Sequence, residues 1–173
     1  MVATGRGATH GVLFRDAAAI ENLCKVDTLI VDKTGTLTVG RPAFEHAVAM
    51  PGFTEDDVLR LAASLDQGSE HPLAAAIVAA ARERGLLLSK AEQFDSESGI
   101  GVRGSVAGES LALGNPALMQ QLGVEVSLLA AQAEALRGRG ASVMHLAVAG
   151  KLAGLLAVSD PIKPTTLDAL AAL

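Results

Sequence analysis

The residues that could do chemistry begin at Asp32, which ends the stretch LIVD at 29–32. An apolar run that ends at a tight, glycine-containing loop is typical of ligand sites at the carboxyl end of a parallel strand. A carboxylate in that place can attack a phosphoryl group and form an acyl phosphate. Lys33 adds positive charge, while Thr34 and Gly35 offer a hydroxyl and backbone N–H groups to phosphate oxygens. The pattern predicts phosphoryl transfer, although three residues alone would also fit a strand that ends in a turn.

Three further stretches are suited to a ligand. SEHPLAAAI at 69–77 places His71 before Pro72, which holds His71 extended at the start of a helix. SGIGVRG at 98–104 and LGNPALM at 113–119 contain glycines, where the missing side chain lets a backbone approach a ligand. Taken alone, a histidine before a helix is more often a cap or a surface residue, and a glycine pair is more often a turn.

The composition permits a globular core and argues against several partners. Half of the 173 residues are hydrophobic but only 2% are aromatic, so the core must consist mainly of Ala, Leu and Val. The net charge of −5 and a pI near 5.3 argue against a nucleic-acid surface. The single cysteine, Cys24, permits no internal disulfide and suits a reducing compartment. No run reaches the roughly 18 apolar residues of a membrane span, and the start lacks the apolar core of a signal peptide, so we expect a soluble chain.

The patterning around these residues predicts strands and helices in turn. Residues 26–32 read as a short buried strand of a parallel sheet. Thr54, followed by acidic residues and then by Val58, Leu61 and Leu65 on one face, predicts a capped helix. The remaining expected elements are a strand at 45–50, helices at 72–85, 116–123 and 128–140, hairpins at 98–115 and at 142–160 around Ala149-Gly150, and a helix capped by Thr165 or Thr166.

This order of elements suggests one α/β domain with another inserted into it. The ends of the chain, 1–40 and 159–173, would belong to a doubly wound sheet, and 41–158 would be a separate α+β unit with an antiparallel sheet flanked by helices. The outer domain would be short of strands, so we expect its remaining strands to lie elsewhere.

The string DKTGTLT at 32–38 resembles the phosphorylation motif of the P-type ATPases, ion pumps that form an aspartyl phosphate. The resemblance implies a haloacid-dehalogenase-like, Rossmann-like fold for the outer domain. It makes Asp32 the phosphorylated residue, with Lys33 beside it, and gives Thr34 and Asp32 a part in holding the phosphoryl group and Mg²⁺. Related phosphatases carry a second aspartate at the position of Thr34, which serves as general acid and base. Because threonine cannot activate water in this way, a pump is favoured over a soluble phosphatase or phosphotransferase.

SEHPLAAAI resembles the signature of the heavy-metal-transporting subgroup of these ATPases. By that resemblance His71 orients the nucleotide and its ring lies against adenine, with Glu70 as a supporting residue. The Gly-x-Gly and Gly-Asn elements of the subgroup correspond to further residues of the same cleft: Gly99, Gly101, Gly114 and Asn115. The family generally has a glutamate five residues before the histidine, and here Asp66 stands in its place with one methylene less of reach.

The resemblance covers essentially the whole chain. The stretch SDPIK at 159–163 is similar to the return from the nucleotide-binding domain, with Asp160 and Lys163 near the hinge. Other catalytic segments of the family are expected beyond Leu173. The chain would therefore bind ATP or ADP, hold only part of a Mg²⁺ site and not turn over alone.

The parent protein would be a membrane ATPase, with this part on the cytosolic face. It would export a metal ion, with Cu(I) or Ag(I) preferred, through a membrane domain and work with the remaining domains of the ATPase. A stand-alone nucleotide-binding module with an inert Asp32 is the other alternative.

Overall fold

The computed structural model describes residues 2–13, 16, 18, 21–22 and 25–172, so Cys24 lies outside it. The chain divides into two units, Met1–Asp32 and Lys33–Leu173. The first contains helix α1, Val2–Thr9. The domain boundaries expected from the sequence, at 40/41 and 158/159, stay a prediction.

The strand expected at 26–32 is wrong. These residues form neither helix nor strand, and Ile30 is 94% exposed. A buried strand is stable only when neighbouring strands take its backbone hydrogen bonds, and residues 26–32 take part in none of the described strand pairings.

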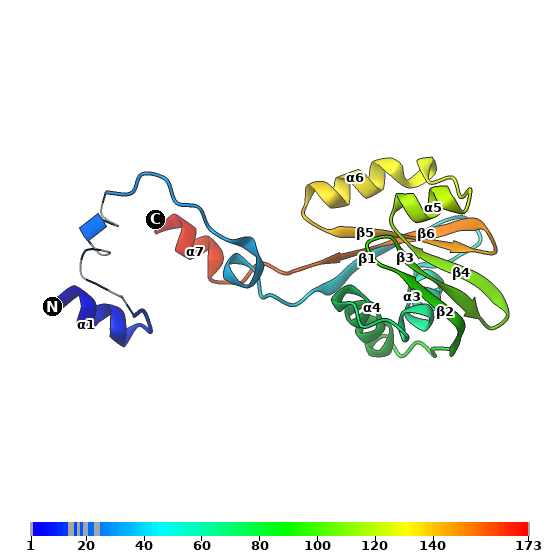
Figure 1. Cartoon of the computed structure of the whole chain (residues 1–173), viewed down its shortest axis with the longest axis horizontal. Helices are drawn as coiled ribbons and strands as arrows, with labels where there is room; N and C mark the ends of the chain where they lie inside the picture. Colours follow the sequence, from blue (N-terminus) through cyan, green and yellow to red (C-terminus); the bar gives the residue numbers. More distant parts are fainter. Residues whose placement is uncertain (1, 14–15, 17, 19–20, 23–24, 173) are drawn as a thin grey trace. The chain divides into compact units, whose positions relative to one another are not determined.

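The described part of the second unit forms one antiparallel six-stranded sheet in the order β1-β6-β5-β4-β3-β2 (Figure 1). The two expected hairpins are present, and both turn on an Ala-Gly pair with positive φ, at Ala107-Gly108 and Ala149-Gly150. One edge strand, β2, was not expected from the sequence. The strands are β1 Ala43–Ala49, β2 Ala91–Glu97, β3 Gly101–Val106, β4 Glu109–Gly114, β5 Ser142–Val148 and β6 Lys151–Ser159.

Helices cover both faces of this sheet. Figure 1 shows α3 and α4 on one face and α5 and α6 on the other. Their bounds are α3 Glu55–Asp66, α4 Pro72–Glu83, α5 Pro116–Gln121 and α6 Ala130–Gly138, the last preceded by a short 3-10 turn, Ser127–Leu129. The core between the sheet and α3 and α4 includes Leu59, Ile77 and Leu146, none of which has exposed surface. None of the helices in the described ranges is long and apolar enough to cross a membrane.

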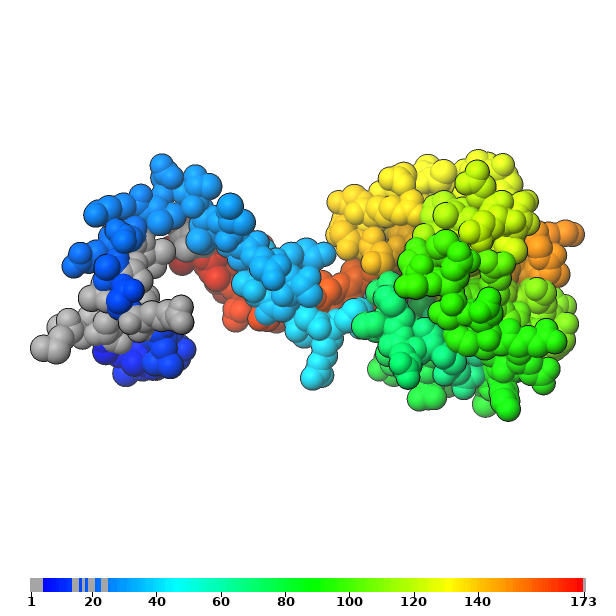
Figure 2. Space-filling view, in the orientation of Figure 1, coloured from blue at the N-terminus to red at the C-terminus, as the bar shows by residue number. Residues whose placement is uncertain are grey.

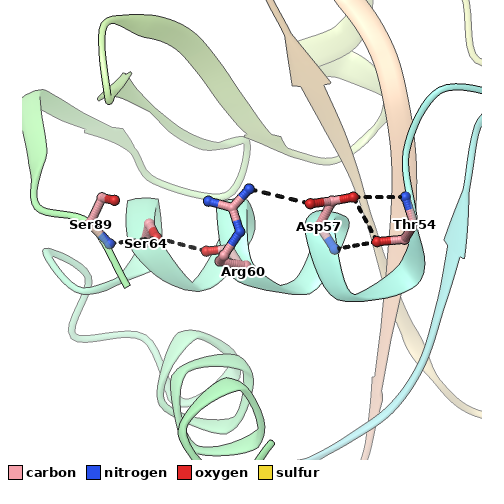
Figure 3. A network of polar contacts seen from close by, with 5 residues as sticks. All are labelled: Thr54, Asp57, Arg60, Ser64 and Ser89. Carbon is pink, nitrogen blue, oxygen red and sulfur yellow. Dashed lines mark hydrogen bonds and ion pairs between the residues drawn. The ribbon is translucent and has the colours of Figure 1, made fainter. Parts of the chain in front are cut away.

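Helix α3 is fixed at both ends (Figure 3). At its start Thr54 and Asp57 form the expected capping box: the Asp57 N–H donates to Thr54 Oγ1 and the Thr54 N–H to Asp57 Oδ2, each at 3.1 Å. Near its end the Ser64 hydroxyl donates to the Arg60 carbonyl at 2.7 Å and accepts from the Ser89 N–H at 3.1 Å. These contacts fix the place of the last residue of the helix, Asp66.

Two segments beside the sheet, 33–41 and 160–166, lie against each other, and we call them the strap (Figure 2). The Asp160 carboxylate accepts from the Thr38 hydroxyl at 2.5 Å and from the Gly40 and Arg41 N–H groups at 2.9 and 3.1 Å. The Thr38 hydroxyl contact, with help from these N–H groups, lowers the pKa of Asp160 below its ordinary value. Hydrogen bonds rather than a core hold the strap together.

The strap also includes the start of the last helix, α7, Thr166–Ala171. The helix begins where the sequence predicts, but neither threonine caps it with its side chain. Instead the Thr166 hydroxyl donates to the Leu37 carbonyl at 2.7 Å. A contact with the other segment of the strap has replaced the local cap.

Candidate ligand-binding cleft

A cleft of about 410 Å³ opens where α3 ends, α4 begins, and β3, β4 and β5 meet at one end of the sheet. The structure brings six of the seven residues that the sequence assigned to a ligand together in its walls. They are Asp66, His71, Gly99, Gly101, Gly114 and Asn115. The seventh, Glu70, is exposed and does not line the cleft, whereas its neighbour Ser69 does.

His71 is the N-cap of α4. Its backbone is extended, as Pro72 requires, and its Nδ1 accepts from the Leu73 N–H at 3.1 Å. A ring nitrogen that accepts a hydrogen bond carries no proton, so the neutral ring has its proton on Nε2. The ring is exposed at the cleft, and its Nε2–H and its face are available to a ligand.

Gly101 and Gly114 face each other on β3 and β4, and a side chain at either position would collide with the neighbouring backbone. A Cβ on Gly101 would lie 2.4 Å from the Leu113 carbonyl oxygen, and one on Gly114 would lie 2.4 Å from the Ile100 carbonyl oxygen. Both distances are shorter than atoms tolerate. Gly101 also has a φ of +153°, in a region that other residues rarely adopt. The wall of the cleft therefore requires glycine at both positions.

Asn115 connects two loops of the cleft. Its Oδ1 accepts from the Leu118 N–H at 3.1 Å and caps α5, while its Nδ2 donates to the Gly99 carbonyl at 2.9 Å. The backbone N–H of Asn115 also bonds the Ile100 carbonyl at 2.9 Å. Asn115 thereby sets the path of the Gly-x-Gly loop rather than only lining the cleft.

Asp66 is the buried acid of the site. It is 5% exposed at the C-terminal end of α3, and burial raises its pKa from 3.8 to about 7. It lines the cleft and also a second hollow of about 330 Å³ between α3 and α4, which Arg82 lines as well. Burial therefore favours the neutral carboxyl group over the carboxylate.

Sequence reasoning missed the contribution of β5. Ser142, Val143 and Met144 line the cleft because β5 pairs with β4, which sets His145 opposite Gly114. No local motif marks these residues, and the sequence predicted their strand only as part of the last hairpin.

The expected phosphorylation residues are exposed, and hydrogen bonds alone order their loop. Asp32 ends the first unit and is exposed. Lys33 and Thr34 belong to the wide turn Lys33–Leu37, are exposed and lie outside the cleft. Lys163 Nζ donates to the Gly35 carbonyl at 2.6 Å and so helps to hold this turn.

The residues present fit a Mg²⁺ ion only in part. Asp32 and Thr34 offer the oxygen atoms that Mg²⁺ prefers. Within the described ranges, however, no three His, Cys, Asp or Glu side chains gather where they could hold a metal ion. We therefore assign no step of a reaction to a metal ion in this chain.

The helix-flanked antiparallel sheet with a cleft at one end is the α+β arrangement that the sequence predicts for the middle of the chain. A family model described as haloacid dehalogenase-like hydrolase matches residues 26–173, and the chain belongs to that family. The expected fold class is thereby confirmed.

Two proteins narrow the relationship further. The chain is 52% identical over all 173 residues to a copper-transporting P-type ATPase of Rhizobium leguminosarum bv. viciae, of which it covers 21%. It superposes on a zinc-transporting PIB-type ATPase in the E2.Pi state with a TM-score of 0.81 at 30% identity, covering 98% of this chain and 27% of that one. The expected resemblance to heavy-metal-transporting P-type ATPases is confirmed.

A second solved structure concerns nucleotide binding. The catalytic domain of the CPx-ATPase CopB-B, described for its conformational changes upon nucleotide binding, matches 98% of this chain and 58% of its own length, with a TM-score of 0.65 and 25% identity. This chain spans about a fifth of the length of the curated relatives that it matches.

Proposed function

We propose that this chain is the nucleotide-binding part of a P-type ATPase that exports a heavy-metal ion by way of an aspartyl phosphate at Asp32. One observation carries the proposal: residues from three separate sequence motifs line one cleft together with Asp66. The cleft volume of about 410 Å³ lies within the range usual for small-molecule and cofactor sites.

In this proposal ATP or ADP binds by its base. The exposed His71 ring stacks on adenine, the close pairing of Gly101 with Gly114 shapes the wall beside the base, and Asp66 meets the Watson–Crick edge of the base. Stacking of a base on a ring contributes about 1–3 kcal/mol, so His71 supplies much of the affinity. Glu70, which lies outside the cleft walls, has no direct part.

The cargo is proposed from similarity. The 52% identity to a copper-transporting relative exceeds the 30% identity to the zinc-transporting structure, which favours Cu(I) or the chemically similar Ag(I). Both are soft ions that thiolates and thioethers select. The ion would cross a membrane domain of the parent protein, with this chain on the cytosolic side.

Calorimetry of ATP binding tests the nucleotide site. His71→Asn keeps an N-cap side chain but removes the ring, so we expect ATP binding to weaken about tenfold or more while the fold is retained. His46→Asn is the matched control, because His46 is exposed on β1 at the other edge of the sheet and should leave affinity unchanged. Equal affinity of both variants and the parent chain would refute the site.

A second experiment tests turnover. Positioning and neutralisation of charge dominate phosphoryl transfer, and each missing donor costs about 2.7–4 kcal/mol in the barrier. Lys163 already bonds the Gly35 carbonyl, and no metal group gathers in the described ranges. We expect no acid-stable label after incubation with γ-labelled ATP and Mg²⁺. Stoichiometric, hydroxylamine-sensitive label that disappears in Asp32→Asn would contradict this.

A further inference from the structure

Asp66 is a buried acid with no part in the proposed phosphoryl transfer. It is the last residue of α3, it is 5% exposed, and it lies in the walls of two adjoining hollows. Throughout the described part of the chain, no donor or cation bonds its carboxylate. The C-terminal end of a helix carries partial negative charge, which further disfavours an ionised carboxylate.

The charged and titratable groups that face Asp66 do not reverse this. From α4, Arg82 lines the second hollow but forms no ion pair with Asp66. His71 Nδ1 accepts from the Leu73 N–H, so this nitrogen offers no proton to Asp66. From β2, Glu97 lines the cleft but is paired with Arg103 at 2.9 Å. Burial is therefore the dominant influence and raises the pKa of Asp66 to about 7.

We propose that Asp66 binds adenine as a neutral carboxylic acid, with its hydroxyl donating to N1 and its carbonyl accepting from the N6 amino group. This inference rests on the proposed nucleotide site. A neutral carboxyl group has one donor next to one acceptor, which matches the acceptor and donor on the Watson–Crick edge of adenine. An ionised carboxylate has acceptors only, so it keeps the N6 contact and loses the one to N1.

The same reasoning predicts how the site separates purines. The Watson–Crick edge of guanine presents the N1 and N2 hydrogens as neighbouring donors, which an ionised carboxylate can accept together. A protonated Asp66 therefore favours adenine over guanine, whereas an ionised Asp66 can accept from both guanine donors. The preference for ATP over GTP should therefore be greatest below pH 7 and shrink above it.

Asp66→Asn provides the decisive variant. The amide of asparagine has nearly the shape of the neutral acid and carries a donor and an acceptor at every pH. We expect ATP affinity of the parent chain to fall about 3- to 10-fold between pH 6 and pH 8.5, which is the loss of one hydrogen bond. The variant should bind at pH 8.5 as tightly as the parent does at pH 6. Because ATP itself titrates in this range, the variant also corrects for the ligand.

The ¹³Cγ shift of Asp66 gives a readout that needs no nucleotide. In the free chain it should titrate near pH 7, and with saturating ATP it should titrate at higher pH. Parallel pH dependence of ATP affinity in the parent and in Asp66→Asn would overturn the inference while leaving the nucleotide site standing. No binding by either folded chain at any pH would refute the nucleotide site itself, and the inference with it.

Discussion

The sheet with its flanking helices, residues 43–159, which we call the sheet unit, is stabilised in a different way from the segment around Asp32. In the sheet unit, apolar residues from α3, α4 and five strands share one core, and the cleft lies at its margin. Before Asp32, Leu29 is 53% and Ile30 is 94% exposed, and the strap depends on side-chain hydrogen bonds. The cleft is thus fixed by a core of the sheet unit, whereas the described residues of the loop at 32–38 are not.

This difference in stabilisation indicates which function the chain can perform alone. A binding site made from backbone and small side chains needs only a stable scaffold, which the sheet supplies. Phosphoryl transfer needs several charged groups held within a fraction of an ångström of their working positions. We therefore expect that the isolated chain binds nucleotide but is not phosphorylated.

Core substitutions should show the largest contrast. Ile77→Ala removes a side chain with no exposed surface, and we expect the free energy of unfolding to fall by about 2–5 kcal/mol. Ile30→Ala removes the same atoms from a residue that is 94% exposed and should change it by less than about 0.5 kcal/mol. Urea denaturation followed by far-UV circular dichroism measures both. Similar losses would mean that residues 26–32 are packed in solution.

Asp66 makes the stability of the sheet unit depend on pH. Its pKa is higher in the folded chain than in the unfolded chain, so the folded chain binds the proton more tightly and stability falls as pH rises from about 4 through about 7. A pKa of about 7 in place of 3.8 corresponds to roughly 4 kcal/mol at most. As pH rises from 5 to 8, the free energy of unfolding should fall less in Asp66→Asn than in the parent chain.

The control for this experiment is Asp95→Asn, because Asp95 is exposed on β2. Urea midpoints at four pH values give the slopes. If the parent chain and Asp66→Asn lose the same stability over this interval, Asp66 is ionised in the folded chain at neutral pH.

Glycine substitutions distinguish the wall of the cleft from its open loop. Gly101→Ala places a Cβ 2.4 Å from a carbonyl oxygen and should cost about 3 kcal/mol, with loss of ATP binding. Gly99→Ala meets nothing within 4 Å, and only its φ of +75° is unfavourable, so about 1 kcal/mol is expected. Thermal unfolding compares the two, and equal losses would show that the wall can move apart.

The smallest effects are expected in the strap. The lowered pKa of Asp160 means that its contacts persist at neutral pH and are lost only as pH falls below the usual aspartate range. Amide shifts of Gly40 and Arg41 should stay constant to about pH 4 and change below it, and Asp160→Asn should abolish that change. A midpoint above pH 4 would show that the carboxylate does not hold these N–H groups.

The sheet unit was largely predictable because its signals are local. The capping box at Thr54, the His-Pro start of α4 and the Ala149-Gly150 turn each act within a few residues, and each appears where the sequence predicts it. The site residues were found through motifs, but the Ser142–Met144 wall depends on pairing between β4 and β5, which no short motif encodes.

The strand at 26–32 failed for the converse reason. Its apolar residues carry the pattern of a buried strand, but strand formation depends on partners elsewhere in a sheet. The cap expected for α7 failed in a similar way, because Thr166 bonds Leu37, more than a hundred residues earlier in the chain. A local sequence pattern indicates which structure a segment prefers, but contacts with residues far along the chain determine whether that structure forms.

The most direct test of the account is an ATP titration of the ¹⁵N-labelled chain without Mg²⁺, followed by backbone amide shifts. We predict that the largest changes lie at His71, Gly99, Gly101 and Asn115, with little change in residues 33–38. Changes concentrated at 33–38, with none around His71, would contradict the claim that the cleft binds nucleotide independently of the phosphorylation loop.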